Sequence, residues 1–131
     1  MSITNEAELT GMQKASEAVA QTLKEMRSYA EPGMTTKQID NYGAKILADF
    51  GAKSAPLLTY RFPGCTCISV NNEVCHGIPS EKRILKEGDL VNIDVSAELN
   101  GYFADTGASV PVPPVAPASQ ALCDATQAAL E

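Results

Sequence analysis

Residues 90–109 read LVNIDVSAELNGYFADTGAS and predict a β-hairpin. Asn100-Gly101 is the strongest two-residue signal for its turn, because a type I′ turn needs positive φ at both central residues. Pairing around this turn sets Leu99 opposite Tyr102, and every further pair follows from that register. The stretch therefore predicts which side chains share a face of the sheet.

The two faces of this hairpin differ in chemistry. Val91, Ile93 and Val95 lie on one face, which the alternation of residues predicts to be buried. Asp94 and Asp105 lie on the other face as diagonal neighbours, with Cα atoms about 7–8 Å apart. Two carboxylates this close repel each other unless a cation or a shared proton lies between them. A divalent cation bound between the two carboxylates would remove this repulsion. The alternative is that both aspartates are solvated on an exposed face. A register shifted by one residue would separate the pair.

Two helices are expected before the sheet. The first is capped by Asn5, which forms a capping-box pattern with Glu8, and it ends at residues 31–33. The second begins at the capping box of Thr35 and Gln38. Apolar residues recur at steps of three and four, so each helix is expected to pack one face on a core. These residues are Leu9, Met12, Ala15, Val19, Leu23 and Met26 in the first helix, and Ile39, Tyr42, Ile46 and Phe50 in the second.

The rest of the chain reads as strands, loops and a final helix. Residues 67–70 predict a short strand, and residues 74–79 a loop punctuated by glycine and proline. Residues 110–117, VPVPPVAP, predict an extended linker that cannot join a sheet ladder. Ser119 is expected to cap a final helix. Its apolar side would consist of Leu122, Ala125, Ala129 and Leu130.

Composition and charge exclude several functional classes. A chain of 131 residues with 44% hydrophobic and 20% charged residues is typical of one globular domain. Its net charge of −6 and 5% aromatic content argue against phosphate backbones, anionic membranes and stacked bases as partners. The N-terminal residues lack the pattern of a signal peptide, and no apolar run reaches the length of a membrane span. We expect a cytoplasmic protein with no nucleic-acid or membrane partner.

The cysteines admit three interpretations. Buried free thiols are expected in a reducing cytoplasm, in preference to disulfides. Cys65, Cys67, Cys75 and His76 form an alternative set of ligands for structural zinc, although their spacing is unusual for tetrahedral closure. A catalytic pair of Cys75 and His76 is less favoured still, because neighbours in the chain point apart.

Further motifs follow one another in a fixed order. They are FPG at 62–64, CISVN at 67–71, VCHGIP at 74–79, GDLVNID at 88–94, GY at 101–102 and DT at 105–106. This set resembles type I methionine aminopeptidase, and the match covers residues 6–110, including PGMTT at 32–36 and the helix of Asp40. The resemblance implies an α+β pita-bread fold, in which an antiparallel sheet with flanking helices is built from two pseudo-symmetric halves.

The resemblance also implies an activity and a site. Enzymes of this family are metal-dependent hydrolases that remove N-terminal methionine from peptides and nascent proteins with a metal-activated water. Asp94 and Asp105 match ligands of two divalent metal ions, which would be cobalt, manganese, iron or zinc. His76, the one histidine of the chain, matches a catalytic residue that hydrogen-bonds the substrate near the scissile bond. Phe62 and Cys67 match walls of the pocket for the methionine side chain, while ordinary core packing explains them equally well.

The resemblance divides the chain into three parts. Residues 1–110 match the N-terminal half of the catalytic domain, 111–118 form a proline-rich linker, and 119–131 begin a helix leading into a second half. The family's ligand histidine and two ligand glutamates belong to that second half, so we expect a truncated chain. The alternatives are a half-length pita-bread module that binds proteins, or a split-enzyme subunit that is inactive alone. In either case a second chain or self-association would cover the missing half.

Overall fold

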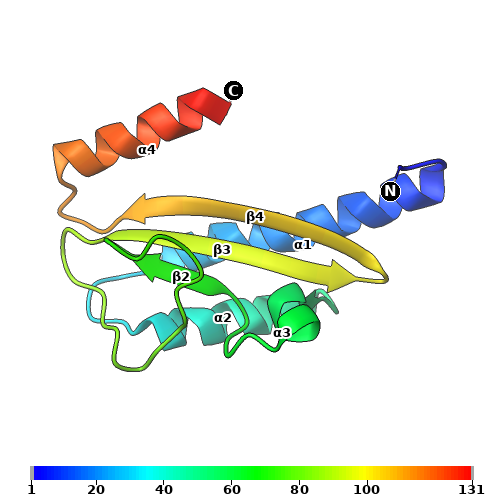
Figure 1. Cartoon of the computed structure of the whole chain (residues 1–131), viewed down its shortest axis with the longest axis horizontal. Helices are drawn as coiled ribbons and strands as arrows, with labels where there is room; N and C mark the ends of the chain where they lie inside the picture. Colours follow the sequence, from blue (N-terminus) through cyan, green and yellow to red (C-terminus); the bar gives the residue numbers. More distant parts are fainter. Residues whose placement is uncertain (1, 131) are drawn as a thin grey trace.

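The computed structural model describes residues 2–130, which form one antiparallel sheet with helices against it. The elements in chain order are α1 (Glu6–Tyr29), α2 (Thr36–Asp49), β1 (Lys53–Ser54), α3 (Ala55–Tyr60), β2 (Cys67–Val70), β3 (Leu90–Leu99), β4 (Tyr102–Pro111) and α4 (Pro117–Leu130). Strand β3 is the centre of the sheet, since it pairs with β1, β2 and β4. Helix α1 runs behind the β3–β4 hairpin, α2 lies beneath the sheet, and α4 stands apart beyond β4 (Figure 1). The predicted mixture of helices and antiparallel sheet is confirmed.

The hairpin has the predicted register. Leu99 pairs with Tyr102, and the pairing continues to the far end of both strands. Asn100 and Gly101 have φ of 52° and 87°, as a type I′ turn requires. The face that carries Val91 and the next two alternate residues of β3 is fully buried and forms the centre of the core.

Both predicted helix starts are formed by side-chain caps. The Asn5 side chain accepts a hydrogen bond of 2.9 Å from the Glu8 N–H, but the Glu8 carboxylate binds the Thr4 N–H instead of completing the capping box. At α2 the capping box is complete, since Thr35 and Gln38 each accept a hydrogen bond from the other's backbone N–H.

The buried face of α2 differs from the predicted one. The prediction that Phe50 belongs to this face is wrong, because its side chain is 38% exposed while Leu47 is buried. The reason is the close approach of α1 and α2 at Gly43, where an added Cβ would lie 2.4 Å from the Met26 sulfur. The buried face of α2 therefore includes Ile39, Gly43 and Leu47, which are spaced four residues apart.

Helix α3 is an element that the sequence did not predict. The Ser54 hydroxyl caps it by accepting a hydrogen bond from the Leu57 N–H, and Pro56 lies in its first turn, where a missing N–H costs nothing. Its six residues are too few to display a helical period.

The proline-rich segment begins as a strand. The prediction that Val110 and Pro111 cannot join a ladder is wrong, because they complete β4 and pair with β3. Proline is tolerated there because it ends an edge strand. Val112 is also buried, and its N–H donates a 2.7 Å hydrogen bond to the Asp89 carbonyl. The chain therefore follows the sheet for two residues past the expected boundary.

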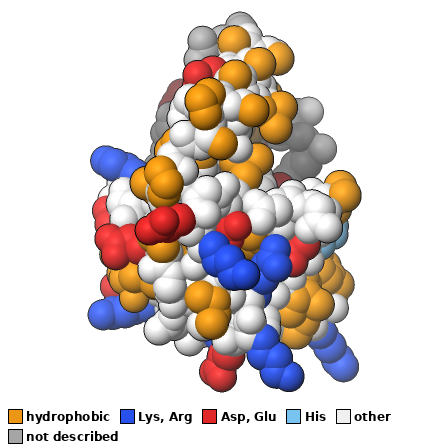
Figure 2. All heavy atoms as spheres, turned by 90° about the vertical axis from the view of Figure 1, so that its left-hand side faces the viewer, with side chains coloured by type: hydrophobic (Ala, Val, Ile, Leu, Met, Phe, Trp, Pro, Cys, Tyr) orange, Lys and Arg blue, Asp and Glu red, His pale blue; other side chains and the backbone are white. Residues whose placement is uncertain are grey.

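Helix α4 begins two residues before the expected cap at Ser119. None of its described residues is buried, and Leu130, part of its predicted apolar side, is 80% exposed. Figure 2 shows this helix projecting above the body with apolar side chains on its surface. Residues 1 and 131, the outer bounds of the predicted parts, lie outside the described residues. No helix within residues 2–130 is long and apolar enough to cross a membrane.

Candidate metal centre

The face of the sheet opposite the core carries the candidate carboxylates. Cys67 pairs with Asp94 across β2 and β3, and Ser96 pairs with Asp105 across β3 and β4. Directly paired residues share a face, and so do Asp94 and Ser96, which are two residues apart on one strand. Cys67, Asp94 and Asp105 therefore lie on one face, which we call the carboxylate face. The predicted diagonal arrangement of the two aspartates is what the register produces.

The two aspartates of this face influence each other directly. Burial, followed by a hydrogen bond to Asp105 and the negative charge of Asp105, raises the pKa of the Asp94 carboxyl to about 6, while the charge of His76 opposes the shift. The Ser96 hydroxyl donates a 2.7 Å hydrogen bond to Asp105. Ionising both aspartates therefore costs free energy, and a cation between them would remove that cost.

Cys67 presents a neutral thiol to the carboxylate face. Its side chain is buried, and burial followed by the charges of Asp94 and Asp105 raises its pKa to about 11. The thiolate, and not the thiol, is the nucleophile and metal ligand among cysteine species. Cys67 is thus suited to pack against a ligand rather than to attack it or coordinate a metal.

Two aromatic rings stand next to this face. Phe62 is buried, and its ring meets that of Tyr60 edge to face, with centroids 6.2 Å apart. Tyr60 is 57% exposed; partial desolvation of its hydroxyl, followed by the charges of Cys67, Asp94 and Asp105, raises the pKa of its phenol. Sequence reasoning missed Tyr60, since it ends the unpredicted helix α3, where Arg61 turns the chain through a left-handed conformation.

His76 lies on the loop between β2 and β3, with an exposed side chain. Its φ of 53° is uncommon for a residue other than glycine. The charge of His76 lowers the pKa of Asp94, which places the imidazole within electrostatic range of the carboxylate pair. Cys67, Asp94 and Asp105 thus share one face, His76 lies within electrostatic range of Asp94, and Phe62 is connected to the face through the ring of Tyr60.

A buried carboxylate fixes the start of β2, and with it Cys67. Asp40 of α2 is 1% exposed and accepts hydrogen bonds of 2.8–2.9 Å from the Cys65 N–H, the Thr66 N–H and the Thr66 hydroxyl. Its second oxygen pairs with Lys37 at 2.9 Å. Asp40 therefore links α2 to the edge of the candidate site.

The carboxylate pair fits a divalent cation as part of a ligand set. Oxygen donors suit such ions, and the pair lacks any other positive partner close enough to form a salt bridge within residues 2–130. In that same range, no three histidine, cysteine, aspartate or glutamate side chains are grouped closely enough to hold a metal. Two aspartates alone therefore leave coordination positions open.

The structural zinc site is not formed in the described part of the chain. Cys65, Cys67, Cys75 and Cys123 are all free, so the preference for free thiols over disulfides is confirmed. The expectation that they are buried is correct for Cys67 alone, because Cys75 is exposed and the other two are half-buried.

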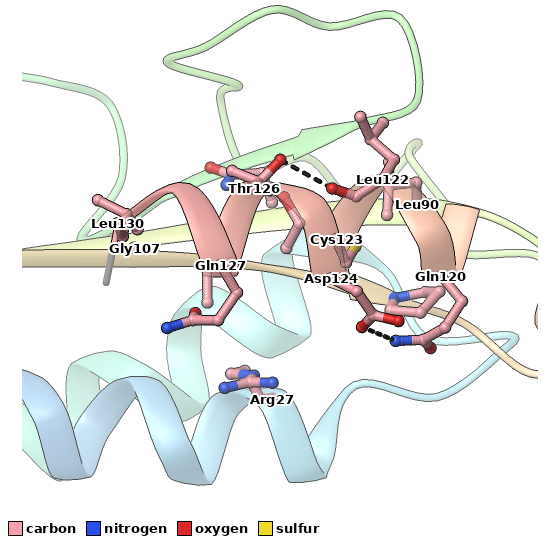
Figure 3. A pocket seen from close by; sticks show the side chains of 14 residues that line it. Arg27, Leu90, Gly107, Gln120, Leu122, Cys123, Asp124, Thr126, Gln127 and Leu130 are labelled. Carbon is pink, nitrogen blue, oxygen red and sulfur yellow. Dashed lines mark hydrogen bonds between the residues drawn. The ribbon is translucent and has the colours of Figure 1, made fainter. Parts of the chain in front are cut away.

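A cavity of about 510 Å³ lies between α4 and the strands β3 and β4, and its lining includes Gly107, which pairs with Asp94 (Figure 3). Its lining includes Arg27 of α1, Ser109 of β4 and Asp124 of α4, but none of the five candidate residues. The carboxylate pair therefore lies on the open sheet face next to this cavity and not inside it.

Comparisons with known proteins agree with the fold. Residues 10–131 match metallopeptidase family M24. Methionine aminopeptidase 2 of Bacillus subtilis is 56% identical over 109 residues, which are 83% of this chain and 44% of that protein. Methionine aminopeptidase of Staphylococcus epidermidis is 44% identical over 132 residues, which are 100% of this chain and 52% of that protein. The crystal structure of methionine aminopeptidase from Thermotoga maritima superposes with a TM-score of 0.91 at 31% identity, covering 97% of this chain and 51% of that one.

These comparisons confirm the predicted pita-bread fold and the predicted relationship. The chain spans about half the length of the curated relatives it matches.

Proposed function

Because the chain belongs to metallopeptidase family M24, we propose that its carboxylate face serves the removal of N-terminal methionine from peptides and nascent proteins. The observation that carries the proposal is that Asp94 and Asp105 are diagonal neighbours on one face of the sheet, beside a neutral thiol and within electrostatic range of a histidine. Nascent chains as substrates would place the protein in the cytoplasm. Residues up to Pro111 would form the N-terminal half of the catalytic domain, since β4 ends there.

Asp94 and Asp105 are the proposed metal ligands. A pair of divalent ions is the proposed cofactor, drawn from cobalt, manganese, iron and zinc, and solvent or another polypeptide segment would supply the remaining ligands. When bound, the metal supplies the Lewis-acid chemistry of peptide-bond hydrolysis. The Ser96 hydroxyl, donating to Asp105, would hold that carboxylate in its orientation.

Phe62 and Cys67 are the proposed walls for the methionine side chain. A buried aromatic ring and an uncharged thiol make an apolar, polarizable surface, which suits a thioether. Cys67 is held rigidly on the carboxylate face, because it lies in β2 and Asp40 fixes the two residues before it. A methionine held there would have its α-amino group and first peptide bond near the aspartates.

His76 is the proposed catalytic residue that does not bind the metal. Its imidazole is exposed and lies within electrostatic range of Asp94. From this place it would donate a hydrogen bond to the substrate next to the scissile bond, where negative charge develops during hydrolysis.

Methionine release from a Met-Ala-Ser peptide, with added Mn²⁺ or Co²⁺, tests the proposal. The protein should release methionine, and Asp94→Asn should reduce the rate at least about a hundredfold by weakening metal binding. Asp124→Asn is the matched control, since Asp124 lies on α4 and its carboxylate accepts a hydrogen bond from Gln120 of the same helix. Release no faster than that of Asp94→Asn would reject hydrolysis by this chain. Equal Mn²⁺ affinity in the variant, measured by calorimetry, would reject Asp94 as a ligand.

A further inference from the structure

The loop that carries His76 is bound to β2 through the next residue, Gly77. The Ile68 N–H donates a 2.9 Å hydrogen bond to the Gly77 carbonyl, and the Gly77 N–H donates a 3.0 Å hydrogen bond to the Ser69 hydroxyl. Both the carbonyl and the N–H of Gly77 are thus hydrogen-bonded to successive residues of β2.

Only glycine permits this approach. A Cβ added at residue 77 would lie 2.1 Å from the Ile68 carbonyl oxygen and 2.8 Å from the Ser69 Cα. Real Cβ atoms essentially never approach backbone atoms this closely, so the absence of a side chain lets the loop lie against β2.

A second attachment lies on the other side of His76. Glu73 accepts a 2.8 Å hydrogen bond from the Val70 N–H, and its own N–H donates to the Val70 carbonyl at 3.2 Å. Arg83 donates to the same carbonyl at 3.1 Å. His76 therefore lies between two points at which the loop is bound to β2.

His76 itself has the left-handed φ described above, and such a conformation persists where its surroundings hold it in place. Ser69 supplies the contact at the peptide bond that joins His76 to Gly77. It is 3% exposed, and it is two residues from Cys67 along β2. Because side chains two residues apart on a strand share a face, the Ser69 side chain lies on the carboxylate face. A buried hydroxyl that accepts a backbone hydrogen bond beside a strained residue is suited to fix that residue's position.

We propose that Ser69 is a positioning residue for His76: its hydroxyl holds the Gly77 N–H and thereby holds the imidazole at the carboxylate face. The hydrogen bonds that fix Gly77, the residue after His76, are independent of any function. Their consequence for catalysis rests on the proposed function.

The chain allows a direct test, because His76 is the one histidine and its imidazole protons give isolated NMR signals. In Ser69→Ala we expect the His76 imidazole signals to shift and broaden. We also expect hydrogen exchange at the Gly77 N–H to become roughly tenfold faster, as loss of one hydrogen bond implies. Ser28→Ala is the matched control, since that hydroxyl bonds the Lys24 carbonyl within α1. It should leave both signals unchanged.

Unchanged His76 signals and unchanged Gly77 exchange in folded Ser69→Ala would overturn the proposal. A serine with a merely structural role would lower the stability of the whole protein without moving the imidazole signals. If Ser69→Ala does not fold, Ser69→Cys decides the matter, because it keeps the size of the side chain and replaces the oxygen with a weak acceptor.

The catalytic consequence is measured separately. In the methionine-release assay, Ser69→Ala should lower kcat about tenfold and change KM less than twofold, since His76 would act on the developing charge more than on substrate binding. A protein that releases no methionine before mutation would refute the proposed function, while the NMR signals would still decide whether Ser69 positions His76.

Discussion

Asp94 and Cys67 face each other across β3 and β2, so a carboxylate with a raised pKa and a thiol with a raised pKa are direct neighbours on the carboxylate face. The negative charge of Asp94 disfavours the thiolate of Cys67, and burial raises the pKa of both groups. The metal-free site is therefore electrostatically costly at neutral pH, and that cost can be measured.

The stability of the metal-free protein should decrease as the pH rises. Folding raises the pKa of Asp94 from its ordinary value to about 6. The protonated carboxyl carries no penalty below pH 4, and ionisation then destabilises the folded state progressively up to about pH 7. Because Asp94 is only half-buried, we expect a loss on the order of 1 kcal/mol. Urea unfolding with a chelator at pH 4.5 and 7.5 measures it. An identical pH dependence in Asp94→Asn would contradict this origin.

Added metal should restore the stability that the metal-free protein loses as the pH rises. A cation that binds only the folded protein stabilises it by about 2.7 kcal/mol at a hundred times its Kd. Mn²⁺ should therefore raise the Tm of the protein at pH 7.5, and Asp94→Asn and Asp105→Asn should each lose most of the increase. Asp49→Asn, at the exposed end of α2, serves as the control. An equal increase in all four proteins would indicate nonspecific binding.

The cysteines should differ in their reaction with iodoacetamide at pH 7.5. Cys67 is buried and its pKa is raised to about 11, whereas Cys75 is exposed. We expect Cys75 to be alkylated at least about tenfold faster, because the thiolate is the reacting species and needs access to the reagent. Peptide mass spectrometry at successive times resolves the two sites. Equal rates would show that Cys67 is open to solvent and is not a packed wall.

Asp40→Ala should destabilise the fold strongly. The variant would leave the N–H groups of Cys65 and Thr66 and the Thr66 hydroxyl without their acceptor, and Lys37 without its partner. We expect a loss of about 3 kcal/mol in the free energy of unfolding. Asp49→Ala, on the same helix, should change it by less than about 0.5 kcal/mol. A loss that small in Asp40→Ala would show that these hydrogen bonds do not hold the start of β2.

The sequence was most informative where structure is local. Asn100-Gly101 determines the turn, the turn determines the register, and the register places Asp94 and Asp105 on one face. The capping residues of α1 and α2 act within a few positions in the same way. These features could be predicted because each depends on residues close together in the chain.

Features that depend on tertiary packing were harder to predict. The buried face of α2 depends on how closely Gly43 meets Met26, a contact between two helices. Tyr60 reaches the site through a six-residue helix whose cap, Ser54, also bonds the Cys65 carbonyl. The bonding of Gly77 to Ser69 likewise spans a loop without a period. No pattern along the chain reports these contacts.

The two-residue turn between β3 and β4 also has a kinetic consequence. Ten residue pairs close across it, so Asp94 and Asp105 meet through contacts of short sequence separation. Such contacts form early in folding because their loop-closure entropy is small, whereas β1 and β2 must reach β3 from more distant parts of the chain. We therefore expect the hairpin to belong to the folding nucleus, with Ala97→Gly slowing refolding more than it speeds unfolding in stopped-flow measurements. The aspartate pair would then exist before the helices have docked.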